Sequence, residues 1–223
     1  VAIGAPDNDK DGKVDRSGHT RVYKWNGASW GQLGTDIDGE NAGDLSGYSV
    51  SLSDDGNVVA IGAPNTNGGT WGTGQTRVFE WKDESAIAAN DASWVQRGDD
   101  INGYLYDASG RSVSLSDDGN VVAIGVPHQD VSDSGTTRIY QWNGVSWGQL
   151  GTDIDGEAAY DRSGGRVSLS GDGTTVAIGA PENDKDGIAD RSGHTRVYQW
   201  NGASWGQLGT DIDGVATNDN AGW

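Results

Sequence analysis

A six-residue segment, Val-Ala-Ile-Gly-Ala-Pro, occurs four times along the chain and constrains its fold more than any other feature. It opens the sequence at Val1–Pro6 and returns at Val59–Pro64, at Val122–Pro127 (with Val126 in place of alanine) and at Val176–Pro181. The copies are 58, 63 and 54 residues apart (59−1, 122−59 and 176−122). A period of this size, with only strand and turn signals inside it, is typical of a propeller or a solenoid.

One full unit contains four strand patterns. Ser49–Ser53 alternates apolar and polar residues, as a half-buried strand does, and Val58–Ala63 is apolar on both faces, as a sandwiched strand is. Thr76–Trp81 and Ser93–Arg97, which runs on into Asp100 and Ile101, complete the unit. Four antiparallel strands that repeat side by side predict an all-β fold of propeller blades. A β-solenoid is the alternative, but its coils are usually much shorter than these units.

The repeats divide the chain into a single propeller segment of about four blades, at approximately 1–48 (lacking its first strand), 49–111, 112–165 and 166–223. The first-strand pattern occurs only three times, so four blades would hold fifteen strands where sixteen are needed (4×4−1). We therefore expect a fragment of a longer array. Unpaired edges at its ends would allow self-association.

Charge and composition limit the partners. Lys and Arg total 15 and Asp and Glu total 33, which gives a net charge of −18. Nucleic acid is an unsuitable partner because phosphate binding needs a basic surface, whereas divalent cations suit an acidic one. Cysteine is absent, so disulfides and thiolate metal sites are excluded. The sequence contains no apolar run long enough for membrane insertion in this segment.

Two short motifs recur together. Ser46–Val50 (Ser-Gly-Tyr-Ser-Val) pairs with Ile61–Pro64, and the same pairing joins Ser109–Val113 with Ile124–Pro127 and Ser163–Val167 with Ile178–Pro181. This pairing resembles the FG-GAP repeat of integrin α-subunit propellers and their bacterial and algal relatives. The resemblance implies a seven-bladed propeller for extracellular adhesion, often with bound calcium. In that family the calcium loop lies between the first and second strands, where this chain has only short turns such as Asp54–Asn57. The family's ligands therefore cannot be transferred by position.

Acidic loops that follow two of the Gly-Ala-Pro copies are the main metal candidates. Carboxylates at alternate loop positions, with a glycine for the sharp turn and a backbone carbonyl as a further ligand, are typical of calcium loops. The alternative is a solvated acidic hairpin. The predicted ligands are Asp7, Asp9, Asp11, Lys13 and Asp15 in the first copy, and Glu182, Asp184, Asp186, Ile188 and Asp190 in the last.

A second set of acidic loops follows the fourth strand of a unit. In an up-and-down blade this loop and the loop between strands two and three emerge on the same edge, so we expect both sets to share one rim. For these weaker metal candidates the alternative is a structural role, because the same side chains make turns by accepting backbone hydrogen bonds. They are Asp36, Asp38, Glu40, Asp44, Asp153, Asp155, Glu157 and Asp161.

No catalytic constellation is evident, and His19 and His194, which precede a third strand, are interpreted as surface or loop-packing residues. We therefore expect a non-enzymatic extracellular or cell-surface module for adhesion or structural assembly. It would be stabilised by Ca²⁺ and would bind an extracellular protein or glycan. Carbohydrate binding through exposed Trp and Tyr is the alternative, although aromatics that repeat once per blade more often form the core. An enzyme would need acids unique to one blade, and most acids here recur.

Overall fold

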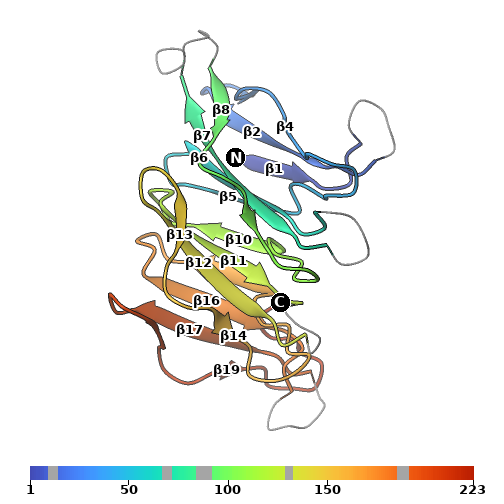
Figure 1. The fold of residues 1–223 in the computed structure, drawn as a ribbon, viewed down its shortest axis with the longest axis vertical. Helices are drawn as coiled ribbons and strands as arrows, with labels where there is room; N and C mark the ends of the chain where they lie inside the picture. Colours follow the sequence, from blue (N-terminus) through green and yellow to red (C-terminus); the bar gives the residue numbers. More distant parts are fainter. Residues whose placement is uncertain (10–14, 67–71, 84–91, 129–132, 185–190) are drawn as a thin grey trace.

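A computed structural model gives the fold of the chain. It describes residues 1–9, 15–66, 72–83, 92–128, 133–184 and 191–223. Nineteen strands lie within this part of the chain, in four antiparallel sheets that follow one another along the long axis of the molecule (Figure 1). No described helix is long and apolar enough to span a membrane. The predicted all-β, propeller-like fold is confirmed.

Each sheet is one blade, numbered in chain order. Blade 1 contains β1 (Ala2–Ala5), β2 (His19–Trp25), β3 (Trp30–Gln32) and β4 (Ile37–Asp38). Blade 2 contains β5 (Ser49–Leu52), β6 (Val58–Ala63), β7 (Gln75–Lys82), β8 (Ser93–Gln96) and β9 (Ile101–Asn102). Blade 3 contains β10 (Ser112–Leu115), β11 (Val121–Val126), β12 (Thr136–Trp142), β13 (Trp147–Gln149) and β14 (Ile154–Asp155). Blade 4 contains β15 (Arg166–Leu169), β16 (Thr175–Ala180), β17 (His194–Trp200), β18 (Trp205–Gln207) and β19 (Ile212–Asp213).

The fourth strand of each blade is broken into two short pieces, where the sequence predicted one. In blade 2, β8 pairs with the far half of β7 and β9 pairs with its near half. Between them, Gly98 has a positive φ of 80°, a conformation that glycine adopts without strain. Gly34, Gly151 and Gly209 repeat this break in the other blades. The break turns the second piece toward the loops that carry the acidic side chains.

The hydrophobic core lies between blades. Val78 on β7 packs with Val113 and Ile124 of the next blade, and Ile139 packs with Val176 and Ile178 one junction further on. Because side chains alternate along a strand, the opposite face of each third strand, which carries Arg77 in blade 2, points toward the preceding blade. At each junction, therefore, an apolar face of one blade packs against a face of the next blade that carries both apolar and polar side chains.

The repeated glycine of Gly-Ala-Pro marks a contact between backbones. A Cβ built on Gly62 would lie 2.0 Å from the carbonyl oxygen of Gly110, which opens the next blade, and the same clash recurs between Gly125 and Gly164. Within blade 3, the amide of Gly110 donates to the carbonyl of Gly125 at 3.2 Å, which holds Gly110 in this position. The pairing of the two sequence motifs thus reflects the place where adjacent blades touch without side chains.

The tryptophans have a structural role at the same junctions. A pair of indole rings packs in each blade, with centroids 5.4 Å apart for Trp142 and Trp147. The Nε1 of Trp147 donates to the carbonyl of Arg97 in the preceding blade at 2.7 Å. Trp94 and Trp205 make the equivalent bond. Only in blade 1 of the described chain is the corresponding face open. There Ile3 is 53% exposed, whereas its counterpart Ile61 is 1% exposed.

Candidate functional site

The two sets of acidic loops lie side by side along one edge of the blades, which we call the polar rim. The amide of Gly43, after β4, donates to the carbonyl of Asp15, in the loop after β1, and Ser46 donates to Ser17. Isolated parallel bridges join the same two loops in all four blades, beginning with Gly18 and Ser46. The structure therefore places both predicted loop sets on one rim.

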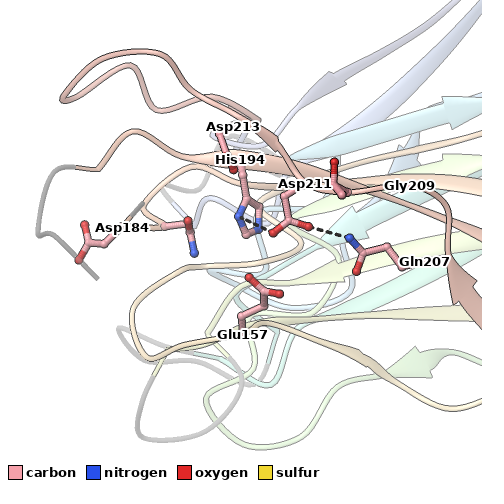
Figure 2. A pocket seen from close by; sticks show the side chains of 9 residues that line it. Glu157, Asp184, His194, Gln207, Gly209, Asp211 and Asp213 are labelled. Atoms are coloured by element: carbon pink, nitrogen blue, oxygen red, sulfur yellow. Dashed lines mark hydrogen bonds and ion pairs between the residues drawn. The ribbon is translucent and has the colours of Figure 1, made fainter. Parts of the chain in front are cut away.

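A pocket on this rim lies at the junction of blades 3 and 4 (Figure 2). His194 is the first residue of β17, Asp211 comes immediately before β19, and Glu157 follows β14 of the preceding blade. One nitrogen of His194 and one carboxylate oxygen from each acid lie within 4.8 Å of one another. The cavity measures about 660 Å³, and Asp184, Asp213 and Gln207 also line it. One histidine and several carboxylates from two blades thus converge on one space.

His194 forms the floor of this pocket and is almost completely covered. Its side chain is 2% exposed, and its ring points toward the space between Asp211 and Glu157 (Figure 2). Nδ1 lies 3.9 Å from Oδ2 of Asp211, while Nε2 has no hydrogen-bond partner in the described structure. Buried polar nitrogens are almost always hydrogen-bonded, so an unpartnered one points to a missing ligand or to chemistry.

The two acids are held differently. Asp211 accepts a 2.6 Å hydrogen bond from Nε2 of Gln207, which fixes one oxygen and leaves the other facing the imidazole. Glu157 is more exposed and lies 3.3 Å from Nη1 of Arg196, whose Nη2 donates to the carbonyl of Asp155. The guanidinium of Arg196, on β17 of blade 4, therefore holds Glu157 of blade 3 beside the pocket.

The same three positions carry other residues at the other two junctions. Between blades 1 and 2 they hold Glu40, Gln75 and Asp100, and Gln75 donates to Glu40 at 3.3 Å. Between blades 2 and 3 they hold Tyr104, Thr136 and Asp153. There Arg138 fills the space, with bonds to Asp153 and Asp107 and its guanidinium over the Tyr104 ring. Within the described residues, only the third junction combines a histidine with two carboxylates.

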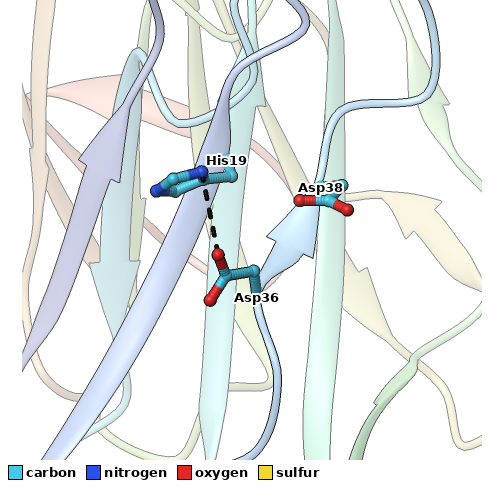
Figure 3. Close-up of side chains that lie close together, drawn as sticks. All are labelled: His19, Asp36 and Asp38. Atoms are coloured by element: carbon cyan, nitrogen blue, oxygen red, sulfur yellow. Dashed lines mark ion pairs between the residues drawn. The ribbon is translucent and has the colours of Figure 1, made fainter. Parts of the chain in front are cut away.

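Blade 1 contains a partial copy of the site. His19, Asp36 and Asp38 also bring one ligand atom each within 4.8 Å of one another (Figure 3). Here Arg21 bonds to both oxygens of Asp36, and Gln32 donates to the same carboxylate. The hydrogen bond and charge of Arg21 lower the pKa of Asp36 from its ordinary 3.8 to about 2. This carboxylate is already neutralised by an arginine, unlike Asp211.

The strong metal candidates are partly engaged with the protein itself. Asp9 accepts backbone bonds from Asp15 and Arg16 at 3.0 Å, and Asp7 is paired with Arg16. Asp184 accepts from the amide of Arg191, and Glu182 is paired with Arg162. Asp11, Lys13, Asp186, Ile188 and Asp190 lie outside the described residues. Calcium binding by these loops stays a prediction.

The weaker candidates separate into four groups. Asp44 and Asp161 are buried and close turns, by accepting from the amides of Asn41 and Ala158. Burial raises the pKa of Asp44, and its Oδ1 has no hydrogen-bond partner in the described structure. Asp153 is bonded to Arg138 and Gln149, and Glu40 to Arg77 and Gln75, whereas Asp155 lies beside Arg196 through its carbonyl. Asp36 and Asp38 meet in blade 1, and Glu157 alone meets a histidine of another blade.

Sequence reasoning missed His194 and Asp211 as site residues. His194 was interpreted as a surface or loop-packing residue, and Asp211 was not among the predicted ligands. The available signal was the combination of positions. A histidine opens the third strand in blades 1 and 4 only, and a glutamate follows the fourth strand in blades 1 and 3 only. Because that loop of one blade faces the third strand of the next, only blades 3 and 4 bring the two together.

Three comparisons relate the chain to known proteins. No family model and no curated protein matches it. Among solved structures it is similar to a proposed 6-phosphogluconolactonase from Bacteroides fragilis, with a TM-score of 0.55 and 11% identity over 90% of this chain. The periplasmic gluconolactonase PpgL of Pseudomonas aeruginosa matches over 100% of this chain and 70% of its own, with a TM-score of 0.43 and 14% identity. TolB of Acinetobacter baumannii matches over 86%, with a TM-score of 0.41 and 14% identity.

These findings correct the expected relationship and function. The solved structure that matches with a TM-score of 0.55 is a propeller named as a proposed 6-phosphogluconolactonase, so the expected kinship with FG-GAP integrin repeats is contradicted. The motif misled because its glycine serves backbone contact between blades, which is a packing requirement and not a mark of adhesion. The expectation of a non-enzymatic adhesion or sugar-binding module is likewise contradicted, because the similar propellers include proteins named as enzymes.

The comparisons define the fold at low identity. The chain spans 37% of the TolB structure and 50% of the Bacteroides fragilis structure. One of the similar structures is described as periplasmic. The chain is accordingly a propeller-like array of four blades that matches part of longer propeller chains.

Proposed function

We propose that this chain carries the site of a hydrolase that opens uncharged sugar lactones at the junction of blades 3 and 4. One observation carries the proposal. The buried His194, with an unpartnered Nε2, lies between carboxylates of two blades at the floor of a cavity of about 660 Å³. A cavity of this size falls within the range of small-molecule sites.

Lactone hydrolysis needs the groups that this pocket supplies. A base takes a proton from water, the water oxygen bonds to the carbonyl carbon, and the ring C–O bond breaks while its oxygen takes up a proton. A carboxylate or an imidazole within hydrogen-bond reach of the water can serve as the base. Asp211, whose Oδ2 lies 3.9 Å from Nδ1 of His194, would orient the ring.

Charge limits the substrate class. Glu157, Asp184, Asp211 and Asp213 line the pocket, and among the described residues Arg196 is buried against Glu157. Such a surface repels phosphate, because phosphate sites are built from arginine, lysine or helix N-termini. We therefore expect a lactone without a phosphate group, unlike the substrate in the name of the Bacteroides fragilis protein. A location outside the cytoplasm is part of the same proposal, as for the periplasmic structure that the chain resembles.

Acid release measured at constant pH tests the proposal, with a six-carbon aldonolactone and its 6-phosphate as substrates and the spontaneous rate subtracted. We expect hydrolysis of the uncharged lactone, and a fall of at least about tenfold in Glu157→Gln and Asp211→Asn, since a general base contributes 10²–10⁴. Glu40→Gln, at the same loop position but beside Gln75, is the matched control and should retain the rate. No rate above the spontaneous one, or an equal loss in Glu40→Gln, would refute the proposal.

Two further proposals concern partners. Calcium in the loops after β1 and β16 is favoured by their alternate carboxylates, and a thermal midpoint that rises with calcium and falls in Asp9→Ala would support it. Self-association is favoured by the exposed blade faces, since Ile3 is half exposed where its counterparts are buried. A sedimentation measurement that finds only monomer at high concentration would exclude it.

A further inference from the structure

We propose that Glu157, His194 and Asp211 bind a divalent transition-metal ion of the zinc type. The proposal deepens the proposed function and rests on its placement of the site at this junction. It makes the junction of blades 3 and 4 a metal centre, distinct from the acidic loops in which calcium was predicted.

The donor set decides the class of ion. Calcium and magnesium prefer an all-oxygen shell, whereas imidazole suits zinc and other transition ions. One nitrogen and two carboxylate oxygens from these residues lie within 4.8 Å of one another, close enough for a single ion to contact all three after small side-chain rotations. Three protein ligands would leave a position for water or substrate, as in catalytic zinc sites.

The buried imidazole is an independent observation that points to a ligand. His194 is held at the pocket floor with an exposed fraction of 2% and an Nε2 that has no partner in the described structure. Leaving such a group unsatisfied costs about 1–3 kcal/mol. An ion bound at Nε2 would remove this cost, because the lone pair of that nitrogen would then be coordinated.

The neighbouring charges permit a cation here and oppose one in blade 1. Gln207, a neutral donor, holds Asp211, so its negative charge remains available. Arg196 pairs with Glu157 at 3.3 Å and donates to the carbonyl of Asp155, so a bound ion would share Glu157 with this arginine. In blade 1, Arg21 already neutralises Asp36 through both oxygens, and no preceding blade in the described structure supplies a third acid. The His19 group is therefore a natural comparison for the His194 group.

Histidine ring NMR tests the inference directly, because the chain contains only three histidines, His19, His128 and His194. The 223-residue chain is freed of metal with EDTA, dialysed, and titrated with Zn²⁺ alone while long-range ¹H–¹⁵N ring spectra are recorded. We expect one ring system to shift at stoichiometric zinc. That shift should be absent in His194→Gln and unchanged in His19→Gln. Ca²⁺ at the same concentration should not reproduce it.

A second variant keeps the test independent of folding. Glu157 is exposed, so Glu157→Gln should fold normally, and we expect its zinc dissociation constant, measured by calorimetry, to rise at least about tenfold. Glu40→Gln should leave the constant unchanged. Three results would overturn the inference: no ring shift, a shift of all three histidines at similar weak affinity, or an equal response to calcium.

The two proposals fail separately. If zinc binds as described but the chain hydrolyses no lactone, the metal centre is supported and the proposed function is refuted. Hydrolysis that survives EDTA with no histidine shift would refute the metal centre and leave the hydrolase standing.

Discussion

Replacement of Arg138 should be among the most destabilising single changes in the chain, because it leaves the buried Asp107 carboxylate without its cationic partner. Arg138 is 5% exposed and bonds at 2.7 Å to Asp107, which is 3% exposed, and at 2.9 Å to Asp153. Burial opposes the charge of Arg138, but its bonds to these two carboxylates raise its pKa overall. Removing one partner of such a pair leaves the other charged and covered, which costs about 3–5 kcal/mol. We expect this loss for Arg138→Met.

The repeat supplies a matched control. Arg77 holds the same position in blade 2, but its acid, Glu40, is 44% exposed and lies 3.6 Å away. In Arg77→Met the Glu40 carboxylate stays in water, and the buried Asp44, which Arg77 attracts, keeps its bond from the amide of Asn41. The loss should therefore be smaller than in Arg138→Met, with about 1.5 kcal/mol of it from the bond between Arg77 and the carbonyl of Asp38. The double variant Asp107→Asn with Arg138→Met should be more stable than Arg138→Met alone, because the stranded charge is gone.

Urea unfolding followed by tryptophan fluorescence measures these differences from the midpoints and slopes. The reasoning would be refuted if the two arginine variants lost equal stability, or if the double variant were no more stable than Arg138→Met. Either result would mean that the cost arises from lost packing of the arginine stem and not from the unpaired carboxylate.

Three further predictions follow from single contacts. Gly62→Ala should lower stability by several kcal/mol or prevent folding, because its Cβ would lie 2.0 Å from the Gly110 carbonyl oxygen. In Gly27→Ala the new Cβ meets no atom within 4 Å, so only about 1 kcal/mol of backbone strain is expected. Urea unfolding midpoints compare the two variants. Trp147→Phe should cost about 1–3 kcal/mol, because it leaves the Arg97 carbonyl without its hydrogen bond. Trp30→Phe lies on an open face and should cost less than about 0.5 kcal/mol in the same assay, as most surface substitutions do. The pKa of Asp36 in the folded protein is about 2, below its ordinary 3.8, so this carboxylate adds stability above about pH 4 that is lost as pH falls toward 2. In Arg21→Gln, carboxyl ¹³C NMR should show this pKa rising toward 3.8. An unchanged pKa would contradict the pairing of Asp36 with Arg21.

The sequence predicted the blades well because their signals are local. Both the alternation in Ser49–Leu52 and the apolar run Val58–Ala63 depend only on neighbours in the chain. The break at Gly98 was missed because a positive φ leaves no periodic signature. The polar rim could be predicted from connectivity alone.

The site could not be predicted in the same way. Glu157 and His194 are 37 residues apart (194−157) and meet only because one blade faces the next. The acids that looked most like ligands by spacing, such as Asp9, are bonded to their own loop's backbone, a difference that spacing does not record. The family inference failed for a related reason, because Gly62 reflects a close approach of backbones and carries no information about a partner.

The contact between Gly62 and Gly110 also bears on how such a chain could diversify. Since backbone atoms alone set the distance between blades at that point, side chains on the polar rim can change without altering the angle between blades. Glu40 with Gln75, Tyr104 with Thr136, and Glu157 with His194 are three such outcomes of copying one unit. The described junctions therefore share one backbone contact, and any one of them can acquire a new chemistry by a few substitutions while that contact keeps the blades in place.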